Sequence, residues 1–167
     1  MSFEVLKPGL LSTFQDLGRL QHQRWGIPVA GALDVNAHRL ANLLVGNPAE
    51  MATLEMNLYP PSFKVRQPCC IAFAGANVSP LVNELKVPMN RPVVLRADDM
   101  ISFGPRLDGA RTYMAVHGGF QLNAVLDSAS TYLRSAIGGL NGKALRKGDV
   151  FHIRKPLLGV DLDELAQ

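Results

Sequence analysis

The sequence has few cysteines, and their arrangement excludes a disulfide framework. Only Cys69 and Cys70 occur in 167 residues, and adjacent side chains on a strand point to opposite faces of a sheet. Small secreted domains depend on several bridges, whereas thiols stay reduced inside the cell. We therefore predict a cytoplasmic protein.

Long apolar runs are also missing. The longest apolar stretches, around residues 40–45 and 71–76, are far shorter than the roughly 20 residues that span a bilayer. Residues 1–7 carry an acid early and lack the basic and apolar segments of a secretory signal. We expect no association with a membrane.

No cluster of one charge sign stands out. The seventeen Lys and Arg residues give a net charge of +3 but are scattered, which argues against nucleic-acid binding. The four histidines lie far apart, and neither Cys-x-x-Cys nor His-x-x-x-His occurs. We expect no metal site.

The composition that remains is typical of a globular protein. Hydrophobic residues make up 47% and charged residues 19%, and the length suits one domain with a substantial core. Short strand-like segments are separated by turn residues, and many short strands favour a closed or nearly closed barrel. The predicted strands are residues 3–7, 52–58, 62–65, 70–74, 93–96, 100–103, 112–116 and 150–154. We predict a mainly β protein with one or two helices.

One helix has clear end signals. Asp34 is a good N-cap and Gly46-Asn47-Pro48 is a good terminator. The buried stripe is predicted from Ala37, Leu40, Ala41 and Leu44. The helix should cover about 35 to 46.

Polar residues flank that stripe. His38 and Asn42 are four residues apart, and Arg39 and Asn42 are three apart, so each pair shares a helix face. These side chains either point into a cleft or form a solvated flank. The sequence leaves both interpretations open.

Residues 10–32 are predicted to form a long loop, and long loops inside compact domains are usually functional. Gln15, Asp16 and Arg19 place an amide, an acid and a guanidinium within it. An Arg fork can hold a carboxylate in two hydrogen bonds, and a neighbouring Asp can orient that fork or act as a base. The alternative is that Asp16 and Arg19 pair with each other and fix the loop.

Other polar residues lie at the ends of predicted elements. Backbone amides of residues 26–34 could hold an anion at the helix start, but a capping Asp34 competes for them, and we favour the cap. Glu55 alternates along a strand and is expected to face solvent. His117 ends a strand before two glycines, and Ser130 and Arg134 lie close together, a combination that suits a carboxylate, carbonyl or phosphate ligand.

Several of these stretches together resemble one family. The similarity covers about residues 3–156, and the blocks that carry it are residues 12–19, 26–34, 39–47, 54–55, 115–120, 128–131 and 142–149. In order and spacing they resemble the amino-terminal half of the biotin-dependent carboxyltransferase-like, or allophanate hydrolase subunit 2-like, family. That family includes the C subunit of prokaryotic 5-oxoprolinase and the carboxyltransferase region of urea carboxylase. Two departures are Ala30, where Ser is usual, and residues 127–129, Asp-Ser-Ala, where Leu-Gly-Ser is usual.

The resemblance implies a fold and a domain layout. It implies a cyclophilin-like β-barrel over residues 1–156, the first of two related halves, followed by a terminal tail at residues 157–167. In that tail, Leu158, Leu162 and Leu165 fall at helical intervals, so it is either a short helix or disordered.

The resemblance also implies a function. The chain would join a protein like the B subunit of 5-oxoprolinase, which we call the B-like protein, and in 5-oxoprolinase also an A-like protein. The complex would open the lactam 5-oxoproline to L-glutamate at the expense of ATP. The chain itself would bind no cofactor: ATP would enter through the complex, and any biotin would arrive on another protein.

Candidate roles follow from this chemistry. We expect Arg19 or Arg39 to bind the substrate carboxylate and Asp16 or Glu55 to handle protons. Asn42 and Ser130 are expected to donate hydrogen bonds. The other candidate substrate contacts are Gln15, His38, His117 and Arg134.

Two further functions stay open. One is carboxyl transfer from carboxybiotin to urea or a similar nitrogen acceptor. The other is a non-catalytic role, in which the chain binds and regulates the B-like protein.

Overall fold

The computed structural model describes residues 2–155, and within them the chain is mainly β with one α-helix. The strands are β1 Phe3–Lys7, β2 Leu11–Gln15, β3 Thr53–Asn57, β4 Ser62–Val65, β5 Cys69–Gly75, β6 Pro80–Val82, β7 Leu85–Lys86, β8 Pro92–Leu95, β9 Met100–Phe103, β10 Arg111–Val116, β11 Phe120–Gln121 and β12 Val150–Ile153. The helix is α1 Val35–Leu44, and two short 3-10 turns cover Gln23–Trp25 and Leu133–Ser135. The predicted tail, residues 157–167, lies outside the described residues.

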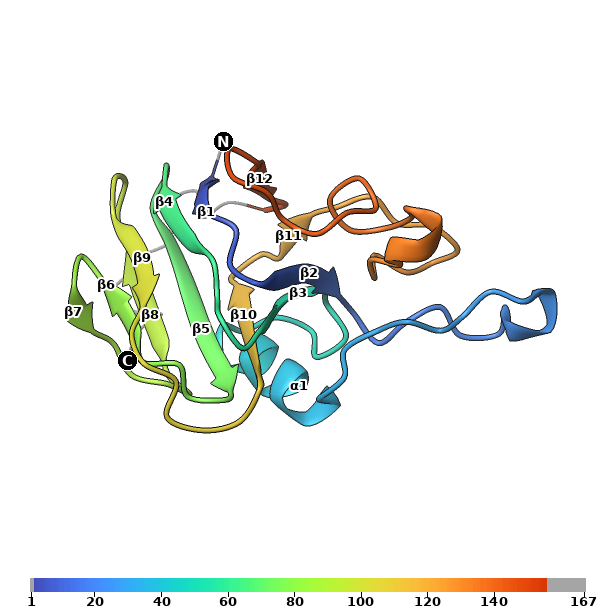
Figure 1. Cartoon of the computed structure of the whole chain (residues 1–167), viewed down its shortest axis with the longest axis horizontal. Coiled ribbons are helices and arrows are strands. Elements are labelled where there is room, and N and C mark those ends of the chain that lie inside the picture. The colour runs from blue at the N-terminus through green and yellow to red at the C-terminus, as the bar shows by residue number, and fades with distance from the viewer. Residues whose placement is uncertain (1, 156–167) are drawn as a thin grey trace.

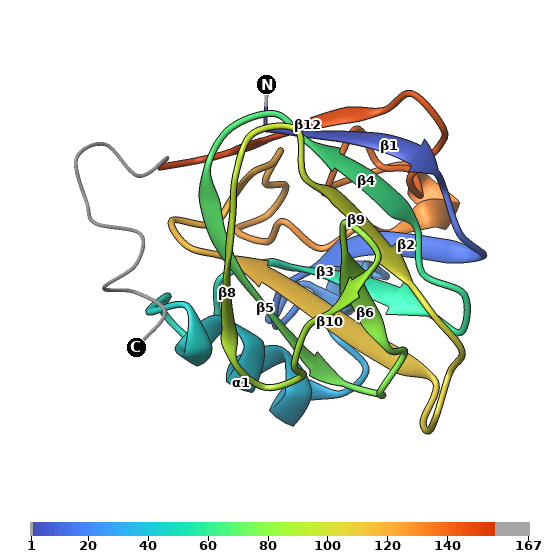
Figure 2. The same cartoon turned by 90° about the vertical axis from the view of Figure 1, so that its left-hand side faces the viewer.

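The strands form two antiparallel sheets (Figures 1 and 2). One has seven strands in the order β11-β12-β1-β4-β9-β6-β7, and the other has five in the order β2-β3-β10-β5-β8. Their inner faces share one apolar core. Phe14 of the smaller sheet, for example, meets Phe151 of the larger one edge to face, with ring centroids 5.3 Å apart. The mainly β prediction is confirmed, and the closed barrel stays a prediction.

Helix α1 covers the outer face of the five-stranded sheet (Figure 2). Small side chains allow this close approach: Ala37 and Ala41 pack on Ala72 and Ala74 of β5. The predicted helix and its Asp34 cap are confirmed, because the Asp34 carboxylate accepts from the Ala37 amide at 3.0 Å.

The predicted buried stripe of α1 is wrong at Leu40, which is 40% exposed. The helix instead turns His38 and Asn42 toward the protein, and both are fully buried. Buried polar groups are tolerated where they find hydrogen-bond partners, and both side chains find them in the turn and strand that follow the helix.

The two cysteines separate as predicted. Cys69 packs in the core between the sheets, whereas Cys70 packs beneath α1 on the opposite face of β5. Both thiols are unbridged. Burial raises the pKa of Cys70 to about 11, so the thiol stays protonated at neutral pH.

The predicted loop over residues 10–32 is wrong at its start, because residues 11–15 form β2 and pair with β3. Phe14 is the one apolar residue on its face of the strand, because its i±2 neighbours Ser12 and Asp16 are polar, so the alternation is too short to indicate a strand. The remaining strands that the sequence did not predict, β6, β7 and β11, have only two or three residues each.

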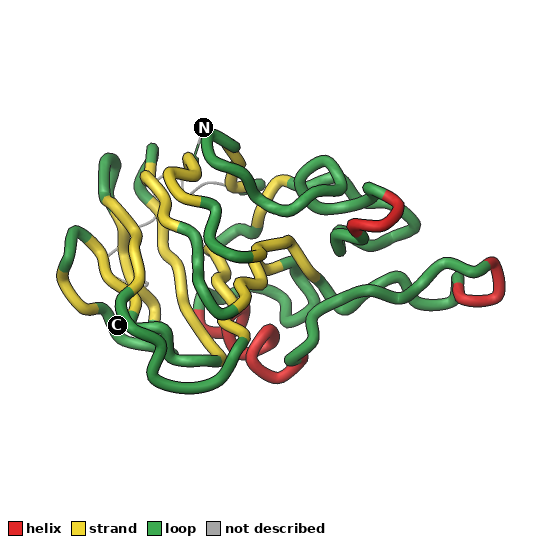
Figure 3. Tube along the Cα trace, in the orientation of Figure 1, coloured by secondary structure: helices red, strands yellow, loops and turns green. Residues whose placement is uncertain are grey.

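Two irregular excursions leave the sheets on the same side (Figures 1 and 3). Residues 17–33 form a long arm between β2 and α1, and residues 122–149 form a second excursion between β11 and β12. No helix in the described part of the chain is long and apolar enough to cross a membrane.

Candidate functional site

Asp16, at the end of β2, binds the segment of residues 128–130. Its Oδ1 accepts from the hydroxyls of Ser128 at 2.7 Å and Ser130 at 2.6 Å, and its Oδ2 accepts from the Ala129 amide at 2.6 Å. The Gly18 amide donates to Oδ1 at 2.8 Å. Both carboxylate oxygens are therefore engaged.

These donors decide the protonation of Asp16. Burial works to raise its pKa, but the hydrogen bonds from Ser130, Ser128, Gly18 and Ala129 outweigh burial and hold the pKa below its usual value. A carboxylate with a low pKa and four donors is a weak proton acceptor. The contacts favour a positioning role, and the predicted proton-handling role stays a prediction.

Arg19 binds the same segment from its other side. The guanidinium is fully buried, and Nε donates to the Val125 carbonyl at 3.0 Å while Nη2 donates to the carbonyls of Ser128 and Ser130. Burial lowers the pKa of Arg19, and the charge of Asp16 opposes this in part. Asp16 and Arg19 do not pair directly in the described residues; each holds residues 125–130 in place.

Residues 31–34, which we call the strap, cross three neighbouring strands on the way to α1. The Gly31 amide donates to Gln15 Oε1 of β2 at 3.1 Å, and the Leu33 amide donates to Glu55 Oε2 of β3 at 3.0 Å. The Asp34 amide then donates to the Tyr113 hydroxyl of β10 at 2.8 Å. One polar side chain from each strand therefore fixes the strap.

Glu55 is the centre of this arrangement. Besides the strap, its Oε2 accepts from the Tyr113 hydroxyl at 2.7 Å, and its Oε1 lies 3.4 Å from Arg111 Nε. The Glu55 side chain is only 15% exposed, so the expectation that it faces solvent is wrong. The strap covers it, which sequence alternation could not reveal.

Asn42 closes the turn that follows α1. Its amide nitrogen donates to the Met51 carbonyl at 2.6 Å, and its oxygen accepts from Asn47 at 3.3 Å. Asn47, which the sequence indicated only as part of the helix terminator, also donates to the Val116 carbonyl at 2.8 Å and accepts from the Gly118 amide at 3.0 Å. The two amides join the helix end to β10.

The two histidines occupy different settings. His38 is buried, with Nδ1 2.8 Å from the Thr53 hydroxyl, and burial lowers its pKa while the Asp16 charge opposes this in part. It stays neutral near pH 7. His117 donates from Nδ1 to the Val45 carbonyl at 2.7 Å, at the end of α1.

The predicted arginines of the helix and second excursion are both exposed. Arg39 lies on the outer side of α1. Arg134 lines a small cavity of about 270 Å³ together with Gln15 and Glu55. The structure thus brings together three predicted site residues there, and it brings Asp16 and Ser130 together in the contacts described above.

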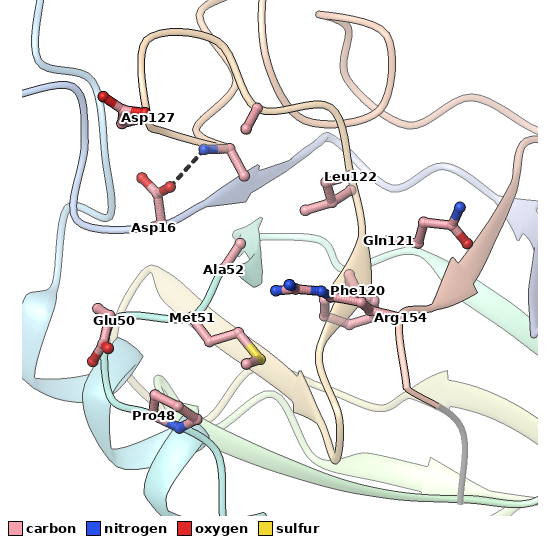
Figure 4. Close-up of a pocket in the computed structure, with 12 residues that line it drawn as sticks. Asp16, Pro48, Glu50, Met51, Ala52, Phe120, Gln121, Leu122, Asp127 and Arg154 are labelled. Atoms are coloured by element: carbon pink, nitrogen blue, oxygen red, sulfur yellow. Dashed lines mark hydrogen bonds between the residues drawn. The ribbon is translucent and has the colours of Figure 1, made fainter.

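A larger cavity of about 600 Å³ lies beside Asp16 (Figure 4). Its apolar lining includes Met51 and Phe120, and its charged lining is formed by Asp16, Glu50, Asp127 and Arg154. Figure 4 shows Arg154 extending beside Phe120, with Asp16 and Asp127 across the cavity. Arg154 is its one cation among the described residues.

The sequence did not single out Glu50, Asp127 or Arg154 as site residues. Asp127 belongs to the segment that departs from the family pattern, which was the one available signal. Its backbone has a φ of 60°, an uncommon value for a non-glycine residue. Arg19 binds the backbone on either side of Asp127, at the carbonyls of Val125 and Ser130, and we call this arrangement the clamp. It holds Asp127 in that conformation.

The residues that line this cavity indicate which ligand groups it can bind. A guanidinium can bind a carboxylate, and the apolar lining can pack against a small ring. In the described residues neither Glu50 nor Asp127 forms a hydrogen bond, so their oxygens remain available for proton transfer, unlike those of Asp16.

Comparison with known proteins gives a consistent result. The family model described as "Carboxyltransferase domain, subdomain A and B" matches residues 25–162. The C subunit of the 5-oxoprolinase of Escherichia coli is 34% identical over 152 residues, which is 91% of this chain and 49% of that protein. The urea amidolyase of Lachancea kluyveri is 34% identical over 158 residues, which is 94% of this chain and 9% of that protein.

A solved structure agrees over the same region. The crystal structure of the K. lactis urea amidolyase superposes with a TM-score of 0.90 at 35% identity, covering 93% of this chain and 9% of that one. The chain therefore spans about half the length of the 5-oxoprolinase relative and a small part of the urea amidolyases.

Proposed function

Because the chain belongs to the carboxyltransferase domain, subdomain A and B, family, we propose that it is one component of an ATP-dependent complex that opens 5-oxoproline to L-glutamate. The observation that carries the proposal is the cavity beside Asp16. It combines one guanidinium, apolar lining and available carboxylates in about 600 Å³, which suits a small lactam that bears a carboxylate.

Each part of the cavity has a separate task. Arg154 binds the substrate carboxylate, and the lactam ring packs against Met51 and Phe120. Glu50 or Asp127 takes one proton from the attacking water as it adds to the lactam carbonyl. The same carboxyl group gives that proton to the ring nitrogen when the carbon–nitrogen bond breaks, which yields the amine of glutamate. Asp16 and Arg19 act as positioning residues, because they hold the segment that carries Asp127.

ATP and the partner proteins complete the reaction. A lactam is stabilised by resonance, so its carbonyl oxygen needs activation, which ATP bound by another protein of the complex would supply. We propose the B-like protein and an A-like protein as partners, in line with the similarity to the C subunit of 5-oxoprolinase. This chain would bind no cofactor itself.

Our proposal for the fold is based on the resemblance to the same family. We propose that residues 1–156 form a single domain and that its two sheets close as a cyclophilin-like barrel. The apolar core that both sheets share supports this arrangement.

The test is turnover by the assembled complex with Arg154 altered. With the purified B-like and A-like proteins, 5-oxoproline and ATP, Arg154→Ala should raise KM about 10- to 100-fold, because it removes a binding interaction for the substrate carboxylate. Arg91→Ala, an exposed arginine outside this cavity, is the control. Unchanged KM in Arg154→Ala, or no glutamate from the wild-type complex, would refute the proposal.

A second candidate is carboxyl transfer from carboxybiotin, carried by another protein, to urea or a similar acceptor. The three carboxylates of the cavity outnumber its one guanidinium, which suits an uncharged ligand that donates N–H groups. Urea-dependent ATP cleavage with a biotin carboxylase and a biotinylated carrier, and none with 5-oxoproline, would favour this reaction. Binding of the B-like protein without turnover of either substrate would favour the regulatory role.

A further inference from the structure

The arm between β2 and α1 projects well away from the sheets (Figure 1). Its outer part, residues 19–30, has a defined base: the Arg19 amide donates to the Val29 carbonyl at 2.7 Å, and the Ala32 amide donates to the Asp16 carbonyl at 2.8 Å. At this base Gly31 packs so closely that a Cβ on it would lie 2.9 Å from the Gly18 nitrogen. The arm therefore leaves the body in a fixed direction.

The tip of the arm presents three stacked side chains. The His22 ring stacks on the Trp25 indole with centroids 5.4 Å apart and planes 28° from parallel. The guanidinium carbon of Arg24 lies 4.2 Å from the centre of the same indole. A 3-10 turn, Gln23–Trp25, holds these residues together. The indole is thus ordered before any partner binds.

Exposure and charge indicate what the tip contacts. Trp25 and Leu20 are each 60% exposed, although apolar surface of this size gains free energy when it is buried. Residues 19–30 contain no Asp or Glu, and Arg24 is exposed beside the indole. Trp and Arg are among the residues most enriched where a few side chains dominate a protein interface.

Nucleic acid is the less suitable occupant. A stacked base would also suit an indole with a nearby guanidinium, but phosphate binding requires several cations along the surface. Arg24 is the one exposed Lys or Arg in residues 19–30, since Arg19 is fully buried in the clamp. The balance of apolar and charged groups therefore favours a protein surface.

We infer that the arm tip docks into a partner protein that presents a carboxylate beside an apolar pocket wide enough for an indole. The inference rests on the proposed function for the identity of that partner, which is the B-like protein. Trp25 would fill the pocket and Arg24 would pair with the carboxylate.

Binding of the purified B-like protein tests this directly. Calorimetric titration should show Kd raised about 30-fold by Trp25→Ala and about 10-fold by Arg24→Glu, as expected for an interface anchor and its charged neighbour. Leu85→Ala is the matched control, because Leu85 is 73% exposed on β7 at the opposite end of the molecule. It should leave Kd unchanged.

Fluorescence gives a second measurement, because Trp25 is the only tryptophan of the chain. Its emission should shift to shorter wavelength and its quenching by acrylamide should fall when the B-like protein is added. A parallel titration with Trp25→Phe supplies the signal of the partner alone. An emission of Trp25 that does not change on binding would overturn the inference.

The remaining outcomes separate this inference from the proposed function. Equal Kd for wild type and Trp25→Ala, or no binding by wild type, would overturn the arm as the docking surface. Turnover of 5-oxoproline by the wild-type mixture, and a raised KM in Arg154→Ala, would keep the proposed function in either case. Binding of a labelled single-stranded oligonucleotide that Trp25→Ala abolishes would overturn the inference in favour of a nucleic-acid site.

Discussion

The hydroxyl of Tyr113 lies 2.7 Å from Oε2 of Glu55, so that β10 and β3 meet through their side chains as well as their backbones. Both groups also accept from the strap, Glu55 from the Leu33 amide and Tyr113 from the Asp34 amide. The start of α1 is therefore fixed by a pair of residues 58 positions apart in the chain.

This pair should show thermodynamic coupling. Glu55→Gln and Tyr113→Phe should each lower the free energy of unfolding by about 1 to 2 kcal/mol, because each removes or weakens hydrogen bonds to partly buried groups. The double variant should lose about 1 kcal/mol less than the sum of the two. Urea unfolding of the four proteins measures this, with Tyr59→Phe, at an exposed tyrosine, as the control. Strict additivity would contradict the role we give the pair.

Asp16 should matter for stability. Asp16→Asn should lower the free energy of unfolding by about 2 to 3 kcal/mol, because an amide cannot accept from all four donors and leaves some of them unsatisfied. Asp127→Asn, at an exposed carboxylate without a hydrogen bond in the described residues, should change it by less than about 0.5 kcal/mol. Equal stability of the two variants in urea would show that the hydrogen bonds of Asp16 do not stabilise the fold.

The contribution of Asp16 should depend on pH in a defined direction. Its pKa is lower in the folded protein than in the unfolded chain, so its stabilising effect is complete above the unfolded value of about 3.9. The effect is lost as the pH falls through the lower, folded pKa. The stability gap between wild type and Asp16→Asn should therefore be constant near neutral pH and narrow below about pH 4. A stability gap that widens in acid would show that the pKa of Asp16 is not lowered in the folded protein.

Two glycines of the arm provide a steric comparison. Gly26 and Gly31 both have positive φ, 75° and 91°, but a Cβ on Gly26 would meet open space whereas one on Gly31 would meet the backbone of residues 17 and 18. Gly26→Ala should cost about 1 kcal/mol for the conformation alone. Gly31→Ala should cost at least about 2 kcal/mol more, because backbone must move. Thermal unfolding of both variants measures the difference. Similar losses of stability would mean that the backbone at the base of the arm can move at little cost in free energy.

The carboxylates of the larger cavity should affect turnover rather than folding. In the assembled complex, Glu50→Gln combined with Asp127→Asn should lower kcat about 100-fold, since general base catalysis contributes at least this much. KM should change less than about threefold, because in the proposed reaction it is Arg154 that binds the substrate carboxylate. Glu84→Gln, at an exposed acid outside this cavity, is the control. An unchanged kcat in the double variant would remove both residues from the reaction.

Local signals in the sequence were sufficient for several elements. The α1 cap at Asp34 and the strands at residues 62–65 and 100–103 were predicted with their observed bounds. Residues 95–103 and 145–153 share a pattern of Leu-Arg, an Asp and alternating apolar residues, which is typical of a turn that leads into a strand. Both copies form the same turn: the Arg96 amide donates to Asp99 at 2.7 Å, and the Arg146 amide donates to Asp149 at 2.8 Å. The predicted family membership is also confirmed, because the family model matches residues 25–162.

The sequence by itself thus determined the features that neighbouring residues control, namely the helix cap, the turns, the alternation of most strands and the order of the family's blocks. Only the tertiary structure decided which polar side chains already have hydrogen-bond partners within the protein. Asp16 meets Ser128 across 112 positions and Arg19 meets Ser130 across 111, and the larger cavity combines residues from widely separated segments. A side chain's chemistry depends on the donors and charges around it, and those neighbours come from parts of the chain that no local pattern connects.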